Sequence, residues 1–452
     1  MTGSDNKRHL PASPAAGRNR GRMSTAILTD VQSRILPVCD RAALIAVLLT
    51  PLLLLHAHGF AEAAIAVTDA CFLTRSAIAR DWTWLRASWL RVGLLWWCWL
   101  VLCSLPVPAL GLGEGGAGSL VQAVAALRFL IFVVALEHEV LSDASARRWL
   151  FGIIAAAAVY IALQVLVQFA FGHNLYGEPS GRDGELTGPF GKPRAGPPLS
   201  RILFPALIPP AAALLARIGV AAKLGAYALL LAGVCVMVLI GQRMPLLLTG
   251  LGLFVSALLL RQLRPLVLVA GVAGATLLAA TVVVSPPTYH RLVLKFSDQM
   301  DHFATSQYGE LYARALEIGE QHPVTGRGFD GFRTGCAMPR YFRASFDGRQ
   351  PEGGGAAICA QHPHNFYAQA LDEGGFPGLI LFAALAIAWL MPLGRGLWRN
   401  PQPLRVGLFA SILIQVWPLA STSAFTSMPM GGWFFLLLGW GLAEARAAGG
   451  TG

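Results

Sequence analysis

Charged residues are scarce in this 452-residue chain and make up only 13% of it. A soluble domain carries roughly 25% charged residues. Hydrophobic residues reach 55%, and the mean hydropathy of +0.56 shows that the deficit of charge extends over the whole length. This composition excludes an ordinary soluble domain. It predicts an all-α polytopic membrane protein.

The sequence also lacks the common catalytic and metal-binding motifs. It contains no Walker loop, no HExxH, no GxSxG and no DxD pair at the end of an apolar segment. The acids Glu310, Asp330, Asp372 and Glu373 are scattered without ligand-like spacing. The net charge of +11 comes without zinc-finger spacing or interleaved aromatic and basic residues. We therefore expect no metal, no cofactor and no nucleic-acid partner.

Apolar segments long enough to cross a bilayer account for most of the chain. There are twelve, near residues 36–55, 57–74, 89–108, 118–137, 149–171, 199–216, 222–240, 244–260, 265–285, 375–393, 404–420 and 430–447. Residues 1–33 combine basic residues with Pro, Gly and Asn, so we expect a disordered basic tail there. The rest divides into residues 34–285 with nine spans and a loop at 172–200, a large loop at 286–374, and residues 375–452 with three spans.

The distribution of basic residues orients these spans. The connections around residues 75–91, 147–148, 217–223, 261–264 and 395–405 are rich in Arg and Lys, which is typical of cytoplasmic loops. Both termini are then cytoplasmic. The opposite face collects the loop at 172–200, the turn IGQRMP at 240–245 and the loop at 286–374. In that last loop, Tyr308, Leu311, Tyr312, Ala315 and Ile318 recur at helical spacing and predict an amphipathic helix.

Polar residues crowd the start of one apolar segment, in QHPHNFYAQALDEGGFPGLILF over residues 361–382. Such residues near hydrocarbon usually mark a site, because they are costly without partners. His364 is suited to act as a general base at neutral pH, with His362 and Asn365 orienting its ring. The alternative is an interfacial histidine that satisfies a loop carbonyl. The neighbouring Asn365 and the arginine turns on the same face favour the base.

Arginines on this face are candidates for binding phosphate, because a guanidinium pairs with two phosphate oxygens at once. Arg243 ends an apolar hairpin, where the alternative is that it extends to lipid headgroups. Arg194 or Arg201 is expected to make a second phosphate contact. The remaining candidates are Arg182, Lys192 and Arg327. Arg128 lies within an apolar segment, so we expect it to pair with Glu137, Glu62 or Asp69.

Two of the seven cysteines, Cys336 and Cys359, share the large loop with no other cysteine. A disulfide between them is expected if the loop faces an oxidising compartment. The alternative is a pair of buried free thiols.

Several short motifs in a fixed order resemble those of the O-antigen ligase and Wzy polymerase superfamily of bacterial envelope glycosyltransferases. They are TGPFGKPRAG at 187–196, GQRMPLLL at 241–248, HPVTGRGFDGF at 322–332 and HPHNFYAQALDEGGFPG at 362–378. The twelve-helix layout with a large loop before the tenth helix resembles the same superfamily, and the fold it implies is similar to that of GT-C glycosyltransferases.

The resemblance implies transfer of a glycan from undecaprenyl diphosphate at the periplasmic face of the bacterial inner membrane. In a ligase the acceptor is a sugar hydroxyl of lipid A-core. His364 would then deprotonate the acceptor, and Arg243 with Arg194 or Arg201 would hold the diphosphate leaving group in an inverting, metal-independent reaction. His362, Asn365, Glu373 and Arg327 are expected to support the site.

Other functions stay open at this point. A Wzy-type polymerase of O-antigen or exopolysaccharide would use another lipid-linked glycan as acceptor, and no motif separates it from a ligase. A transporter of a lipid-linked anion belongs to a different class, but transporters usually show repeats and polar breaks near the bilayer centre. A structural component of the envelope would not need a histidine and several arginines on the same face of the membrane.

Overall fold

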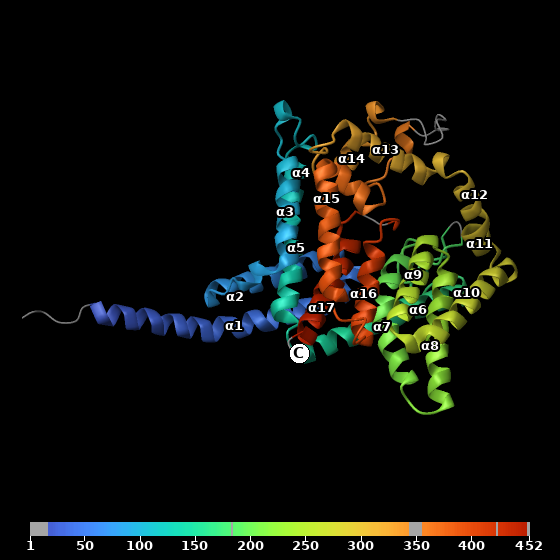
Figure 1. Cartoon of the computed structure of the whole chain (residues 1–452), viewed down its shortest axis with the longest axis horizontal. Helices are drawn as coiled ribbons and strands as arrows, with labels where there is room; N and C mark the ends of the chain where they lie inside the picture. The colour runs from blue at the N-terminus through green and yellow to red at the C-terminus, as the bar shows by residue number, and fades with distance from the viewer. Residues whose placement is uncertain (1–16, 182–183, 343–354, 422–423, 450–452) are drawn as a thin grey trace, which may run out of the picture.

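The computed structural model describes residues 17–181, 184–342, 355–421 and 424–449. Over these residues the chain is helical and forms no β-strand, as the composition predicted (Figure 1). The first half contains α1 (Gly17–His56), α2 (His58–Ala79), α3 (Ser88–Cys103), α4 (Gly116–Ala125), α5 (Leu127–Ala135), a π-helical turn (Leu136–Val140), α6 (Ala144–Phe171), α7 (Gly196–Leu215) and α8 (Val220–Ile240). The second half contains α9 (Arg243–Leu259), α10 (Arg264–Val284), α11 (Pro286–Tyr289), α12 (Lys295–Asp301), α13 (Gln307–Gln321), α14 (Gly331–Gly335), α15 (Phe366–Gly394), α16 (Pro403–Gln415) and α17 (Met428–Gly449).

Each of the twelve predicted apolar segments is largely helical. Among the described residues, seven helical stretches are long and apolar enough to cross a membrane: Arg34–His56, Gly116–Val140, Ala144–Phe171, Gly196–Leu215, Val220–Ile240, Arg261–Val284 and Phe366–Gly394. Helices α3, α9 and α16 are apolar but shorter. Helices α2 and α17 are not among the stretches that are both long and apolar enough. The chain is therefore a polytopic membrane protein, while the count of twelve spans stays a prediction.

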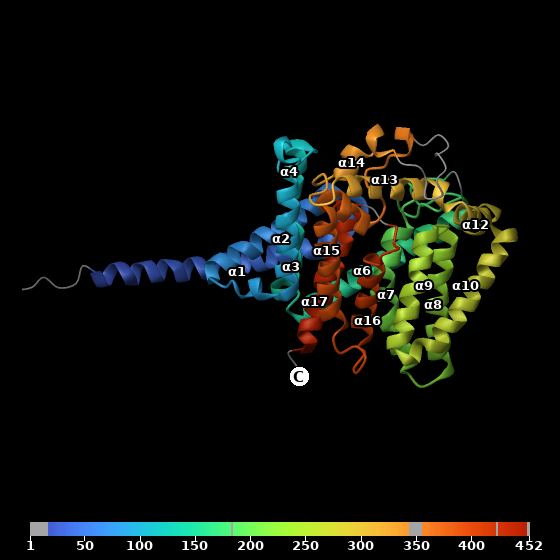
Figure 2. The same ribbon diagram turned by 45° about the horizontal axis from the view of Figure 1, so that its top comes forward.

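The start of the chain differs from the expected disordered tail. Helix α1 begins at Gly17, so residues 17–33 are helical, and residues 1–16 lie outside the described part. This stretch holds no proline before Pro37 and contains Arg, Ala, Leu and Gln, which favour helices. The start of α1 projects away from the other helices in both views (Figures 1 and 2).

The long connections between helices that carry the candidate site residues lie at one end of the helical bundle. Figure 1 shows α4, α12, α13 and α14 at this end and the carboxyl terminus at the other. We call them the loop end and the terminus end. Apolar residues of α15 and α17 form a shared aromatic core, in which the rings of Trp389 and Phe434 lie 5.4 Å apart. Within the bundle, Arg128 pairs with Glu62 at 3.4 Å, one of the three partners expected for it.

A second, smaller core lies in the large loop. The predicted amphipathic helix is α13, and the hydroxyl of Ser306 caps it by accepting the Gly309 N–H at 3.2 Å. Its inner face packs with α14 and the disulfide region. We call this set the loop core: Leu311, Ala315, Ile318, Phe332, Cys336 and Tyr341. The large loop is therefore folded on a core of its own.

Helix α15 is broken where it meets this loop. Gly375 has φ +64° and ψ −164°, a conformation that side-chain-bearing residues avoid. A Cβ there would lie 2.5 Å from the Pro323 carbonyl oxygen, and the next residue, Phe376, donates its N–H to that oxygen at 2.8 Å. Gly326 in turn lies against the Asp372 carbonyl. The glycines of HPVTGRGFDGF and GGFPG thus let these two motifs interlock.

Candidate active site

The predicted base lies just before α15. His364 has φ +59°, which is uncommon for a residue other than glycine and is found at ligand-binding and catalytic positions. The rings of His364 and His362 lie 4.5 Å apart, and the ring of Tyr308 from α13 lies 5.6 Å from His364. Both histidines are half-buried. The structure therefore brings the two predicted histidines together and adds Tyr308 beside them.

Asn365 fixes the backbone next to His364. Its side-chain oxygen accepts the N–H groups of Tyr367 and Ala368 at 2.9 and 3.1 Å, which caps α15. Its amide nitrogen donates to the Pro418 carbonyl at 2.7 Å. Asn365 thus anchors the histidine segment to the connection between α16 and α17, and this is how it supports the site.

Glu373 and Arg327 are structural in this arrangement. The Glu373 carboxylate accepts Gln369 Nε2 at 2.9 Å and the Asp330 N–H at 3.2 Å. Arg327 is fully buried and pairs with Glu114, and it donates to the Tyr341 hydroxyl at 2.6 Å. Glu114 already pairs with the Arg327 guanidinium, so its charge is balanced within the protein. Both residues hold the interlocked motifs together.

The surroundings of Arg327 also hold His322. Its Nε2 lies 2.7 Å from the Tyr341 hydroxyl and 3.6 Å from Glu114. Burial lowers the pKa of His322, with Glu114 opposing the shift and Arg327 adding to it. Burial likewise raises the pKa of Tyr341. Both pKa shifts favour the neutral forms of His322 and Tyr341, which lie beside the ion pairs of Glu114 with Arg327 and Arg340.

Arg201 is the most buried of the phosphate candidates. It lies in the second turn of α7 at 5% exposure, and its guanidinium contacts the sulfur of Met430 from α17. Among the residues that the structure describes, no carboxylate forms an ion pair with it. A buried cation is costly without an anion. Arg201 is therefore well placed to receive an anionic ligand.

Arg243 lies at the start of α9 and is half-buried. Its guanidinium contacts Gln299 of α12, so this arginine is tied to the large loop. Arg194 and Lys192 are exposed. Arg182 lies outside the described residues. Of the two arginines expected to make the second phosphate contact, Arg201 is buried and Arg194 is exposed.

Gln242 connects the two arginine motifs. Its Oε1 accepts the Gly196 N–H at 3.0 Å, and its Nε2 donates to the Pro193 carbonyl at 2.7 Å. A Cβ on Gly196 would lie 2.3 Å from that Oε1, so the close approach needs glycine. Gln242 therefore joins the turn that contains Arg243 to the backbone on either side of Arg194.

Two connecting segments were not identified from the sequence. Residues 411–430 contact both halves of the site, since Asn365 bonds to Pro418, the Ser411 hydroxyl contacts the Arg201 carbonyl, and Met430 contacts the Arg201 side chain. Residues 299–308 run from the partner of Arg243 to the ring beside His364. No motif marks either segment.

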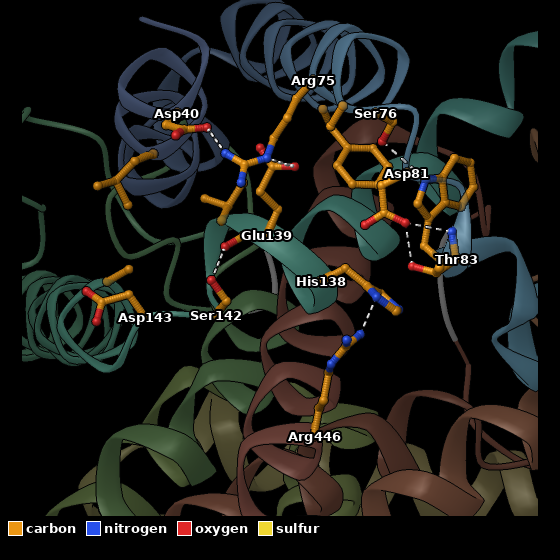
Figure 3. A pocket seen from close by; sticks show the side chains of 16 residues that line it. Asp40, Arg75, Ser76, Asp81, Thr83, His138, Glu139, Ser142, Asp143 and Arg446 are labelled. Atoms are coloured by element: carbon orange, nitrogen blue, oxygen red, sulfur yellow. Dashed lines mark hydrogen bonds and ion pairs between the residues drawn. The ribbon is translucent and has the colours of Figure 1, made fainter. Parts of the chain in front are cut away.

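A cavity lies away from the candidate site, at the terminus end (Figure 3). It has a volume of about 450 Å³ and lies between α1, α2, the π-helical turn and α17. Its charged side chains mainly bind one another: Arg75 pairs with Asp40 at 2.5 Å and with Glu139 at 3.4 Å, and Arg446 contacts His138. These contacts join four helical segments, which explains the cluster as structural.

Comparison with known families bears on the loop end. Residues 227–383 match the O-antigen ligase family. The resemblance to O-antigen ligases and Wzy-type proteins is thereby confirmed over this segment, which runs from α8 into α15. No curated protein matches the chain.

The O-antigen ligase match includes Arg243, Arg327, His362, His364 and Glu373, and it ends before α16. Arg194 and Arg201 lie before it. The segment matching the family therefore contains the two histidines and Arg243. Arg201 belongs to α7, whose first residue, Gly196, bonds to Gln242 of that segment. Over the described residues, no three His, Cys, Asp or Glu side chains are grouped so as to hold a metal ion.

Proposed function

We propose that the protein is an O-antigen ligase that transfers a glycan from undecaprenyl diphosphate to a sugar hydroxyl of lipid A-core. The observation that carries this proposal is the O-antigen ligase match over residues 227–383, because it covers both His364 and Arg243. The loop end is taken as the periplasmic face, with both termini in the cytoplasm of a bacterial inner-membrane protein. The positive-inside distribution supports this orientation.

The reaction follows from the chemistry of these residues. The imidazole of His364 accepts the proton of the acceptor hydroxyl as the hydroxyl oxygen attacks the anomeric carbon. The bond from that carbon to the diphosphate oxygen breaks on the opposite side, so the anomeric configuration inverts. Undecaprenyl diphosphate leaves with the bonding electron pair. Negative charge therefore grows on the diphosphate as the reaction proceeds.

Arginines stabilise that growing charge. The buried position of Arg201 supports a role as diphosphate ligand, because an anion there would neutralise a cation that no described carboxylate pairs with. Arg243 is the second ligand, held near the large loop by Gln299. The fixed guanidinium charges supply the electrostatic stabilisation, so no divalent metal is required.

The products formed by the purified protein test this function. The full chain in detergent is incubated with undecaprenyl-diphosphate glycan, lipid A-core and EDTA, and the lipids are separated by mass. Glycan on lipid A-core supports the ligase, and its formation in EDTA supports metal independence. Longer lipid-linked glycans with unmodified lipid A-core would instead show a Wzy-type polymerase. Movement of the lipid across liposomes without either product would show a transporter.

A further inference from the structure

The segment that carries the two histidines is held at both ends. After it, Asn365 caps α15 and bonds to Pro418. Before it, Cys359 forms a disulfide with Cys336 of the loop core, with the two Cα atoms 5.7 Å apart. These are the two cysteines that the sequence predicted to pair. Only residues 360–364 lie between the two anchors.

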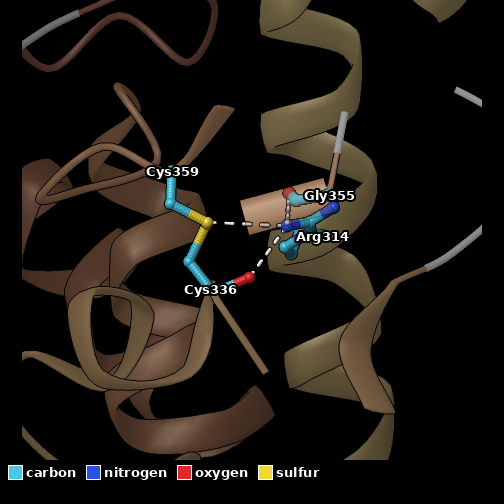
Figure 4. Close-up of a disulfide and its surroundings, with 4 residues drawn as sticks. All are labelled: Arg314, Cys336, Gly355 and Cys359. Carbon is cyan, nitrogen blue, oxygen red and sulfur yellow. Dashed lines mark hydrogen bonds between the residues drawn. A yellow bond between two sulfur atoms is a disulfide. The ribbon is translucent and has the colours of Figure 1, made fainter. Parts of the chain in front are cut away.

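Arg314 of α13 reinforces the first anchor (Figure 4). Its Nη1 donates to the Cys336 carbonyl at 2.8 Å and to the Gly355 carbonyl at 2.7 Å, and it lies 3.5 Å from the Cys359 sulfur. The side chain is only 3% exposed and lies 4.0 Å over the ring of Phe342. Three points of the large loop thus converge on one guanidinium.

The same helix presents Tyr308 to His364. Tyr308 and Arg314 both belong to α13, and Ala368 of α15 packs on the loop core beside Cys359. The loop core therefore connects the disulfide to the helix whose Tyr308 ring lies beside His364. Loss of the disulfide would free one end of residues 360–364 while the other end stays capped.

We propose that the Cys336–Cys359 disulfide and Arg314 form a positioning unit for His362 and His364, so that the candidate active site is complete only when these two thiols are oxidised. The inference rests on the proposed function, because it takes His364 as the base. The unit touches neither substrate, and its effect is on where the imidazole lies. Small displacements of a reacting group cost as much as about 100-fold in rate.

The redox step is a thiol–disulfide exchange. Bond formation releases two protons and two electrons from the two cysteines, and a disulfide-bearing oxidant accepts them. In the reverse direction, dithiothreitol attacks one protein sulfur, forms a mixed disulfide and then closes to its own cyclic disulfide. The protein is left with two thiols.

The test uses the full chain in detergent and two measurements. The first is hydrogen exchange of the backbone amides of residues 360–368, and the second is glycan transfer to lipid A-core. Cys336→Ser/Cys359→Ser, Arg314→Met and dithiothreitol-treated wild type are compared with untreated protein. Cys98→Ser/Cys235→Ser is the control, because both of these cysteines lie in apolar helices away from the loop core.

We expect faster exchange at residues 360–368 and unchanged exchange in α9. We also expect kcat to fall by roughly 10–100-fold while the KM for the donor is unchanged, because the arginine side of the site is not altered. Reoxidation should restore both properties, and the control should keep the wild-type response to dithiothreitol. A purely structural role would instead accelerate exchange throughout the bundle.

Unchanged exchange at residues 360–368 after verified reduction would overturn the proposal, and so would full activity of the reduced protein. If untreated wild type transfers no glycan, the proposed function fails. The exchange measurement then still decides whether the disulfide positions the histidine segment. If the double variant does not fold, dithiothreitol-treated wild type provides the reduced protein instead.

Discussion

Gln242 and Gly196 are joined across the two arginine-bearing segments by a hydrogen bond of 3.0 Å from the Gly196 N–H to Gln242 Oε1. The same side chain donates to the Pro193 carbonyl at 2.7 Å. The turn IGQRMP therefore contributes Gln242 to the site in addition to Arg243. Its glutamine sets how α7 begins relative to α9, and hence where Arg201 lies.

Replacing Gln242 with Met should disturb both stability and donor binding. The change keeps the length of the side chain but leaves the Gly196 N–H and the Pro193 carbonyl without this partner, at about 1–3 kcal/mol for a buried group. We expect a lower thermal midpoint and a higher KM for the undecaprenyl-diphosphate donor. Gln262→Met, at an exposed position of the terminus end, is the control. Equal behaviour of the two variants would show that the glutamine does not join the segments.

Arg201→Met should weaken binding of the donor without lowering the stability of the protein. Removing charge-assisted hydrogen bonds to a diphosphate should weaken donor binding by about 1.5–3 kcal/mol, or roughly 10–100-fold. The free energy of unfolding should hold or rise, because a buried cation is replaced by an apolar side chain. Donor affinity and thermal unfolding of the same preparation are compared. Arg194→Ala, at an exposed position, should change donor affinity much less.

A matched control for Arg201 is Arg405, which is also buried but lies at the terminus end. Its Nη2 donates to the Arg395 carbonyl at 2.8 Å. Arg405→Met should lower stability without changing donor affinity. If Arg201→Met lowered stability and kept donor affinity, Arg201 would be a structural residue like Arg405.

Gly375→Ala should destabilise the protein through the break in α15. Its backbone conformation costs a residue with a Cβ about 1–3 kcal/mol, and that Cβ would lie 2.5 Å from the Pro323 oxygen. Gly271→Ala in α10 is the control, because a Cβ there meets no atom within 4 Å. Alanine at such a helical position should instead stabilise by about 0.5–1 kcal/mol. Thermal unfolding in detergent should show shifts of opposite sign, and a neutral Gly375→Ala would contradict the interlocked arrangement.

Much of the site could be predicted from the sequence because its parts are local. His362, His364 and Asn365 are consecutive in a polar run before an apolar helix, and Cys336 and Cys359 are alone in one loop. Spacing also predicted α13. These features need only the chain near them.

The parts that were missed or misplaced depend on distant contacts. Arg327 was expected to support the site, but its partner Glu114, from the connection before α4, could not be predicted from the sequence. Neither the Met430 contact with Arg201 nor the Gln242 bridge has a local pattern, because each joins segments that are far apart in the sequence. The helical start at Gly17 was missed because basic and polar composition was given more weight than helix propensity.

Acidification should loosen the loop core through His322. Burial lowers the pKa of this histidine below 6.5 in the folded protein, so the unfolded chain takes up its proton first as the pH falls. The stability contributed by the neutral imidazole is therefore complete above about pH 6.5 and is lost as the pH falls from there toward the folded pKa. Hydrogen exchange of α13 amides measured on both sides of this value should show less protection on the acidic side. His322→Gln should reduce that difference, and an unchanged pH dependence would exclude His322 as its cause.

The central claim is that His364 takes the proton of the acceptor hydroxyl. The direct measurement is donor binding and glycan transfer by His364→Ala, beside His302→Ala at an exposed position of the same large loop. We predict that His364→Ala binds the undecaprenyl-diphosphate glycan like wild type and transfers it about 10²–10⁴-fold more slowly, while His302→Ala is fully active. Transfer by folded His364→Ala at the wild-type rate would contradict the account.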